Sequence, residues 1–425
     1  MAPSSSSSIR WKLIALLSSL LAGFLFLATT NRNDEVAQLL SQPVEDDDQS
    51  GTGIVNLLRG QGQADCLGAP YLYVTLHDKT ANVLKFSRDG CLLSDNVLLM
   101  DEAYKSVFDV EFRSMAIGKH KDHDALFIAD ASDHNSRLLV FGKCIESMEN
   151  YGKRHFVEIV VDSKHNKGVD HTYGVCLDKE GNVYISNQHT DSVLRFQVGS
   201  FKPMALPRSL QLDSRLDYYD GTFVQFGLPK QHEPSDQGVR AVCHVHDKIW
   251  IAHEEISGVA ITDVASGLVT DIIPLDTPVG LFHDLNLGVV FVSCRSKERG
   301  GIVYALDAFN FKIRHSYVHK KMIHPTGIII IFSIFHFFTD IFFYFFSISN
   351  YKYFRTILTR FFYFPFFFLL FFPVGMTTYD GILYVAEQHI GAILSFDIQS
   401  ESFIRNVVRS LDKSDRIEQL VLSPC

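Results

Sequence analysis

The chain has 425 residues, of which 47% are hydrophobic, and a formal net charge of −9 at pH 7. This length accommodates one large domain or two ordinary ones. No stripe of Lys and Arg side chains is present that could neutralise phosphates, so we exclude nucleic acid as a partner.

The N-terminus is predicted to be a separate element. Residues 1–30 begin with a Ser-rich stretch, carry Arg10 and Lys12, and continue with the apolar run Leu13–Thr29. This layout is typical of a secretory signal peptide, and its length also reaches the lower limit for a membrane-spanning anchor. Residues 31–63 are polar and acidic and are predicted to form a disordered linker. The protein is therefore expected in the secretory pathway, either secreted or anchored to the membrane by this single helix.

A three-strand pattern recurs six times within residues 64–425. Each unit has a short apolar strand, a turn, a second strand such as Val-Tyr-Ile-Ser, a polar loop and a third strand that often ends in Phe. Alternating polarity and enrichment in β-branched and aromatic residues predict strands rather than helices. The second strands are expected to begin near Tyr71, Ala125, Asn182, Lys248, Val289 and Ile382.

The C-terminal segment completes this set of repeats. A first strand precedes five of the six units, and the first unit lacks one. Residues Ile417–Ser423 have the alternation that this missing strand requires. The sequence therefore predicts an all-β, six-bladed propeller that its C-terminal strand closes, which also removes an exposed sheet edge. An open array of β-sandwiches is the alternative, but it would not need that strand.

The third unit carries the most characteristic motif. It runs His171-Thr-Tyr-Gly-Val, a Gly-Asn turn, then Val-Tyr-Ile-Ser-Asn and a third strand ending at Phe196. This unit resembles the NHL repeat, and so does His324–Phe396 once an interruption is removed; the other four units match only in their strand pattern. The resemblance implies a β-propeller whose relatives include interaction platforms, lactonases and amidating lyases, so it does not specify one function.

The interruption covers residues 328–375 and is expected to divide the first strand of blade six between Gly327 and Met376. It contains 17 of the 35 Phe residues of the chain. A hydrophobic membrane hairpin is one interpretation. A retained intron is the one we favour, because T-rich codons encode Phe, Ile and Tyr and because removal restores a clean repeat. Such an apolar segment, if expressed, would promote aggregation.

The predicted blades bring polar residues to one face. In an antiparallel blade, the start of the first strand lies beside the end of the second. His171 is therefore expected beside Asn187, and His324 beside Glu387. Just inside the first strands, Arg113, Arg240 and Glu418 are expected where other blades carry Gly174, Gly280 and Gly327. The candidate binding residues are His171, Asn187, Asp130, His253, His324 and Glu387.

The family resemblance adds a catalytic hypothesis for this face. The amidating-lyase branch holds zinc through His residues at such positions, with Arg and Tyr nearby. The resemblance thus implies His171 and His324 as ligands of one divalent ion on the axis, with Arg113, Arg240 and Tyr173 as catalytic companions. The lactonase branch instead implies a set of axial Asn, Asp and Glu residues, which are Asn187, Asp130 and Glu387 here.

A structural role explains the same residues without any reaction. In NHL-like repeats the His and the Asn or Asp side chains close turns by hydrogen bonding to the backbone. The favoured hypothesis is therefore a module that binds a protein or small-molecule ligand at one face of the ring. A metal-dependent enzyme, lyase-like or lactonase-like, is the alternative.

The seven cysteines are divided by context. Cys176, Cys243 and Cys294 lie inside predicted strands and are expected to be buried, inert thiols. Cys66 and Cys425 flank the propeller, where a bridge between them would join its two ends.

Overall fold

The structure is a computed structural model, and the described part of the chain has no helix, only strands and turns. The described residues are 68–76, 83–100, 110–121, 123–132, 135–146, 152–197, 199–204, 219–226, 238–296, 300–319, 322, 373–388, 391–408 and 416–424. The predicted N-terminal helix and linker lie outside them, as does most of the predicted insert. Within the described residues, no helix is long and apolar enough to cross a membrane.

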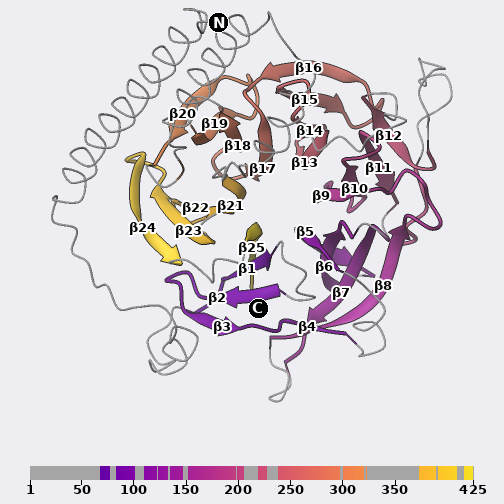
Figure 1. The fold of residues 1–425 in the computed structure, drawn as a ribbon, viewed down its shortest axis with the longest axis horizontal. Coiled ribbons are helices and arrows are strands. Elements are labelled where there is room, and N and C mark those ends of the chain that lie inside the picture. Colours follow the sequence, from indigo (N-terminus) through magenta and orange to yellow (C-terminus); the bar gives the residue numbers. More distant parts are fainter. Residues whose placement is uncertain are drawn as a thin grey trace, which may run out of the picture. The chain divides into compact units, whose positions relative to one another are not determined.

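Six sheets, antiparallel except for one short parallel pair at the edge of the second, are arranged around a common axis (Figure 1). Each sheet has an innermost strand near the axis and three further strands outward, and the second blade has one additional short strand. Blade 1 contains β25 (Ile417–Ser423), β1 (Tyr71–Leu76), β2 (Val83–Phe86) and β3 (Leu92–Ser94). Blade 2 contains β5 (Phe112–His120), β6 (His123–Asp130), β7 (Arg137–Cys144), β8 (Arg154–Asp162) and the edge strand β4 (Leu98–Leu99).

The other four blades have the same order, from the axis outward. Blade 3 contains β9 (Thr172–Leu177), β10 (Val183–Asn187), β11 (Ser192–Phe196) and β12 (Thr222–Gln225). Blade 4 contains β13 (Val239–Val245), β14 (Lys248–His253), β15 (Gly258–Asp263) and β16 (Val269–Pro274). Blade 5 contains β17 (Pro278–Asp284), β18 (Val289–Ser296), β19 (Gly300–Asp307) and β20 (Ile313–Tyr317). Blade 6 contains β21 (Pro373–Tyr379), β22 (Ile382–Glu387), β23 (Ala392–Asp397) and β24 (Ser402–Val408).

The C-terminal strand closes the ring as predicted. β25 pairs with β1 in antiparallel register, from Tyr71 opposite Ser423 to Leu76 opposite Ile417. The first and last parts of the propeller therefore share one sheet (Figure 1). The prediction of an all-β, six-bladed propeller is confirmed.

The hydrophobic core lies between adjacent blades. Phe127 of blade 2 and Ile185 of blade 3 belong to one buried cluster, and neither side chain is exposed. The second strand of each blade is buried on both faces, which explains why these strands read as nearly continuous apolar runs. The outer strand β16 is instead largely exposed.

All six innermost strands contain an irregularity in register at the same position. In β13, Val239 pairs with His253 and Val242 with Ile251, so Arg240 and Ala241 together face a single residue of β14. The same two-against-one count occurs in β5, β9, β17, β21 and β25. Such bulges redirect side chains. They place one extra residue per blade next to the axis.

Neighbouring innermost strands approach closely through a small-residue contact. The Ser293 hydroxyl accepts a hydrogen bond from the Gly280 amide at 2.8 Å and donates one to the Val374 carbonyl at 3.3 Å. A Cβ atom added to Gly280 would lie 1.9 Å from that carbonyl oxygen, so only glycine fits there. Ser186 makes the same connection between Gly174 and Arg240.

The first strand of blade six begins before Met376 in the described part of the chain. β21 is continuous and begins with Pro373-Val374-Gly375, the last residues of the predicted insert. These three residues occupy the positions that Pro278-Val279-Gly280 occupy in β17. Residues 373–375, which we assigned to the end of the insert, therefore form the start of β21.

Candidate functional site

Six side chains form a ring at the bulge positions of the innermost strands. Gly174 and Gly280, which we expected at this level, lie one residue further along their strands, because the bulge adds a residue before them. The ring residues are Arg113, Tyr173, Arg240, Val279, Val374 and Glu418. We call the polar residues of this ring, together with the side chains that pair with them, the axial polar cluster.

Tyr173 fills the space at the axis. Its side chain belongs to a buried cluster whose other members all come from blades 1, 5 and 6, including Val279 and Val374. Because Tyr173 itself comes from blade 3, its ring reaches across the axis. Burial raises the pKa of Tyr173 well above its ordinary value, and Glu418 raises it further. The phenol therefore keeps its proton at neutral pH and can donate a hydrogen bond.

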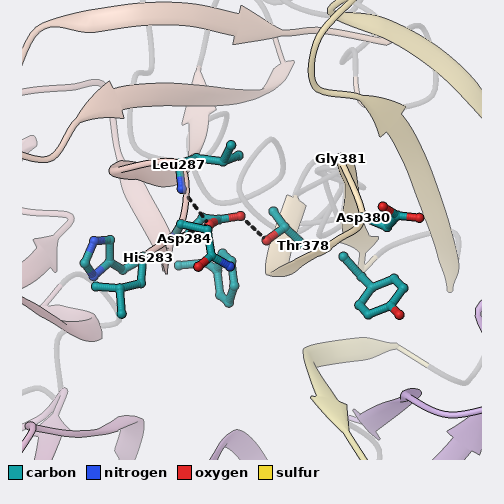
Figure 2. A pocket seen from close by; sticks show the side chains of 10 residues that line it. His283, Asp284, Leu287, Thr378, Asp380 and Gly381 are labelled. Carbon is teal, nitrogen blue, oxygen red and sulfur yellow. Dashed lines mark hydrogen bonds between the residues drawn. The ribbon is translucent and has the colours of Figure 1, made fainter.

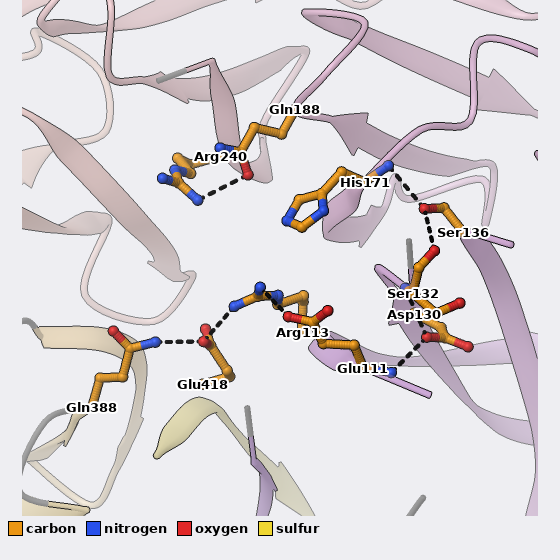
Figure 3. A network of polar contacts seen from close by, with 10 residues as sticks. All are labelled: Glu111, Arg113, Asp130, Ser132, Ser136, His171, Gln188, Arg240, Gln388 and Glu418. Atoms are coloured by element: carbon orange, nitrogen blue, oxygen red, sulfur yellow. Dashed lines mark hydrogen bonds and ion pairs between the residues drawn. The ribbon is translucent and has the colours of Figure 1, made fainter. Parts of the chain in front are cut away.

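Arg113 is held by two carboxylates (Figure 3). Its Nη1 atom lies 2.6 Å from Oε1 of Glu418, and its Nη2 pairs with Glu111. Burial alone would lower the pKa of Arg113, but Glu418 and Glu111 outweigh that effect and raise it. Gln388 of blade 6 also donates to Glu418. One polar chain thus joins blades 6, 1 and 2.

Arg240 continues the cluster through blades 3, 4 and 5. It donates to Gln188 Oε1 at 2.9 Å and to Glu254 Oε2 at 2.8 Å. The other oxygen of Glu254 lies 3.9 Å from a guanidinium nitrogen of Arg295. Three guanidinium groups and three carboxylates therefore balance in charge across the cluster, and both donors and acceptors face the axis.

Asp130 serves a structural purpose in this arrangement. Its side chain is fully buried, accepts from the Glu111 and Ser132 amides at 2.8 and 3.2 Å, and pairs with Arg137 at 2.7 Å (Figure 3). It thereby fixes the backbone of Glu111, whose carboxylate meets Arg113. Burial raises the pKa of Asp130, an effect that Arg137 opposes. Asp130 is a positioning residue.

The remaining second-strand candidates are buried within their own blades. Asn187 accepts a hydrogen bond from the Thr172 hydroxyl at 3.3 Å, and its side chain is not exposed. His253 is 1% exposed and lies 3.0 Å from Asp191, with its ring edge against Phe226. Glu387 is also fully buried. These residues occupy equivalent positions at the ends of their strands, but they do not converge on one ligand.

His171 faces a second histidine rather than Asn187. Its ring stacks on His189 with centres 4.5 Å apart, and its amide donates to Ser136 Oγ at 2.9 Å (Figure 3). The second metal candidate, His324, lies outside the described residues. Among the residues that the structure describes, no group of three or more His, Cys, Asp or Glu side chains is arranged to hold a metal ion.

Sequence reasoning missed four members of the cluster. Gln188, Glu254 and Gln388 follow directly on the last residue of a second strand, one position after Asn187, His253 and Glu387, and Arg295 is the penultimate residue of β18. The sequence does contain a signal for them, because polar residues recur at the ends of the second strands, one position after the candidates. Only the pairing geometry shows that this later position, and not the candidate position, reaches the axis. The missed residues are Gln188, Glu254, Arg295 and Gln388.

Of the three cysteines predicted to be buried in strands, Cys294 is buried and Cys176 and Cys243 are partly exposed. Cys176, Cys243 and Cys294 are free thiols, and burial raises the pKa of Cys243 to about 12. Cys91 and Cys144 are both disulfide-bonded. The predicted Cys66–Cys425 bridge lies outside the described residues.

Comparison with known proteins shows no family for this chain. No family model and no curated protein matches the chain. A structure of the nidogen/laminin complex is similar over 83% of this chain and 98% of its own, with 10% identity and a TM-score of 0.47. The periplasmic gluconolactonase of Pseudomonas aeruginosa is similar over 81% of this chain and 83% of its own, with 11% identity and a TM-score of 0.47.

A third similar structure is an inactive virginiamycin B lyase from Staphylococcus aureus. The match covers 55% of this chain and 54% of the lyase chain, with 12% identity and a TM-score of 0.30. The similar structures include a protein complex and enzymes, and at these identities and TM-scores they carry no conclusion about this chain. The chain is a six-bladed β-propeller, the fold that its NHL-like repeats predicted.

Proposed function

We propose that this protein is a recognition module that binds a ligand at the axial polar cluster. The observation that carries the proposal is the convergence of Arg113, Tyr173, Arg240 and Glu418 from four blades onto one point of the ring. Each arginine is anchored by a carboxylate, so the donors are rigid before any ligand arrives. Rigid, preorganised groups lower the entropic cost of binding.

The chemistry of the cluster favours hydrogen-bonded recognition. Tyr173 retains its proton, and the guanidinium groups of Arg113 and Arg240 are permanent donors. Because positive and negative groups balance, the best-matched ligand carries both donors and acceptors and little net charge. A polar loop of a partner protein or a small zwitterionic or polyhydroxylated molecule meets this requirement.

A binding screen tests this function on the full chain. The probes are amino acids, sugar acids and short peptides, and the readout is thermal stabilisation of the wild type, Arg240→Gln and the matched exterior variant Arg314→Gln. We expect at least one probe to stabilise the wild type and Arg314→Gln but not Arg240→Gln. Stabilisation that persists in Arg240→Gln would contradict a site at the axis.

Metal analysis of the same protein distinguishes the enzymatic alternative. We expect no stoichiometric divalent ion in the purified chain, and no change in its stability on addition of a chelator. One tightly held divalent ion per chain that is lost in His171→Ala, together with turnover of a lactone or peptide substrate, would replace the recognition module with a metal-dependent enzyme.

We further propose that the protein enters the secretory pathway through residues 1–30, as a secreted or single-pass anchored protein. The disulfides at Cys91 and Cys144 support this, because disulfides persist in oxidising compartments. Protease protection of a C-terminally tagged chain in microsomes is the test. A tag that is fully digested without detergent would contradict entry into the lumen.

A further inference from the structure

A cavity lies at the face of the ring opposite to the axial polar cluster. It has a volume of about 580 Å³ and is formed between the β17–β18 turn of blade 5 and the β21–β22 turn of blade 6 (Figure 2). β17 and β21 begin near the axial polar cluster and end at this cavity, so the two sites are separated by the length of a strand. The volume is in the range of ordinary ligand pockets.

The polar groups of this cavity are acidic. Asp284 is engaged in holding the two turns, since it accepts from Thr378 Oγ1 at 2.5 Å and from the Asn286 and Leu287 amides at 2.9 and 3.0 Å (Figure 2). Asp380 lines the same cavity, is exposed, and has no ion-pair partner within the described parts of the chain. No Lys or Arg side chain lines the cavity.

The nearest cations are already engaged elsewhere. The Arg88 guanidinium packs over the Tyr379 ring, with its central carbon 4.2 Å from the ring centre, and does not line the cavity. Arg314, which donates to the Leu287 carbonyl, pairs with Asp307 at 2.7 Å. Burial lowers the pKa of His283 in the cavity wall, so this imidazole is neutral at pH 7. Asp380 therefore lines the cavity without an ion-pair partner among the described residues.

The rim of this cavity is apolar and exposed. Leu285 is 72% exposed and Phe309 is 71% exposed, which makes them the two most exposed large hydrophobic side chains of the described residues. Leu287 of the same turn as Leu285 is 40% exposed. Phe309 does not line the cavity itself; it lies against Gly288 of this turn and stacks on His246 of blade 4, with ring centres 4.3 Å apart. Exposed apolar side chains beside a pocket mark interaction surfaces more often than isolated ones do.

We propose that this face binds a protein segment in which a basic residue has apolar neighbours. The Lys or Arg side chain enters the cavity toward Asp380, where Phe282 and Tyr379 flank its alkyl stem. The apolar neighbours pack on Leu285, Leu287 and Phe309. The opposite charge supplies orientation and the exposed rim supplies buried apolar area, as in other interfaces with a polar pocket and an apolar surround.

Synthetic peptides test this surface on the full chain. The probe is a fluorescent peptide with one arginine between leucine and phenylalanine, compared with a peptide in which neutral citrulline replaces that arginine. We expect the arginine peptide to bind saturably and the citrulline peptide to bind about threefold to fivefold more weakly, as for a partly exposed ion pair. Replacing the leucine and phenylalanine by alanine should abolish measurable binding.

Three variants locate the contact. Asp380→Asn should weaken the arginine peptide about threefold to fivefold and leave the citrulline peptide unchanged; asparagine tolerates the backbone φ of 50° at this position. The double variant Leu285→Ser, Phe309→Ser should weaken both peptides, while the control variant His165→Gln, at an exposed side chain beyond β8, should weaken neither. Circular dichroism and melting curves verify that each variant is folded.

The outcomes that overturn the proposal are distinct. If the arginine and citrulline peptides bound with equal affinity, or if the wild type and Asp380→Asn bound the arginine peptide with equal affinity, recognition of a basic side chain by Asp380 would be disproved. Binding of free arginine amide as tightly as the peptide would identify a small-molecule site instead. Absence of saturable binding by any of these probes would overturn the surface altogether, and none of these results bears on the axial polar cluster.

Discussion

The guanidinium group of Arg240 lies over the ring of Tyr173, with its central carbon 4.8 Å from the ring centre, and Arg113 lies over the same ring at 5.8 Å. Two cations thus face one aromatic side chain at the axis, an arrangement that is favourable when the ring is shielded from water. Tyr173 is 9% exposed. The contact links blades 2, 3 and 4, so it contributes both to the closure of the ring and to the proposed site.

Tyr173→Ala is expected to destabilise the fold far more than Tyr173→Phe. Alanine leaves a cavity across the axis and costs about 3–5 kcal/mol of the free energy of unfolding. Phenylalanine keeps the ring and both cation contacts and should cost less than about 1 kcal/mol. Urea unfolding measures both values. Similar losses in the two variants would show that the hydroxyl, not the ring, matters.

Arg113→Met is expected to cost about 3–5 kcal/mol, because it leaves Glu418 as a buried charge with its main cation removed. The side chain of Glu418 is only 1% exposed. The double variant Arg113→Met, Glu418→Gln removes both charges and should recover most of the loss. Denaturant unfolding of the three proteins checks this, and a double variant as unstable as the single one would contradict it.

Gly280→Ala should prevent or severely impair folding, since the added Cβ would lie 1.9 Å from the Val374 carbonyl oxygen in the next blade. Ser293→Ala removes the hydrogen bonds to Gly280 and Val374 and should cost about 1–3 kcal/mol. Gly68→Ala is the matched control, because no atom lies within 4 Å of its added Cβ. Yields and thermal melting points rank the three variants; a melting point of Gly280→Ala close to that of Gly68→Ala would refute the close approach.

A chain that lacks residues 328–375 is expected to fold and to aggregate less. Its strand would read Pro325-Thr326-Gly327 where the longer chain has Pro373-Val374-Gly375. Threonine in place of the buried Val374 should cost about 1–2 kcal/mol. Adding Thr326→Val to the shortened chain should recover the lost stability. Light scattering and melting curves compare the forms; failure of both shortened chains to fold would show that the segment is required.

Stability should fall as the pH drops below about 6.5, through His244 and His283. Burial lowers the pKa of both from the ordinary value of 6.5. The unfolded chain therefore binds protons first, so this contribution is complete above pH 6.5 and is lost as the pH falls toward the folded-state pKa values. Unfolding by urea at pH 7.5 and 5.5 measures the difference in the free energy of unfolding between the two pH values. His283→Gln should reduce this difference, and the exposed control His165→Gln should leave it unchanged. Equal pH dependence of His283→Gln and wild type would exclude His283.

The sequence alone determined the fold of this protein. Six copies of a period-2 strand pattern, with an unpaired copy at Ile417–Ser423, permit few arrangements other than a closed ring, because each sheet must bury both faces against neighbours. It also determined that Arg113, Tyr173, Arg240 and Glu418 lie near the start of innermost strands. Local pattern suffices for these predictions because strand pairing within a blade is local.

The tertiary structure decided which side chains meet. The bulge in every innermost strand shifts the ring by one residue, which brings Tyr173 to the level of Arg240 and leaves Asn187 and Glu387 buried. Contacts between blades, such as Gln388 with Glu418, depend on register across sheets that no single repeat encodes. Equally, only the tertiary structure shows that residues 373–375 pair within blade 6 as the start of β21, because the pairing of strands depends on the folded chain.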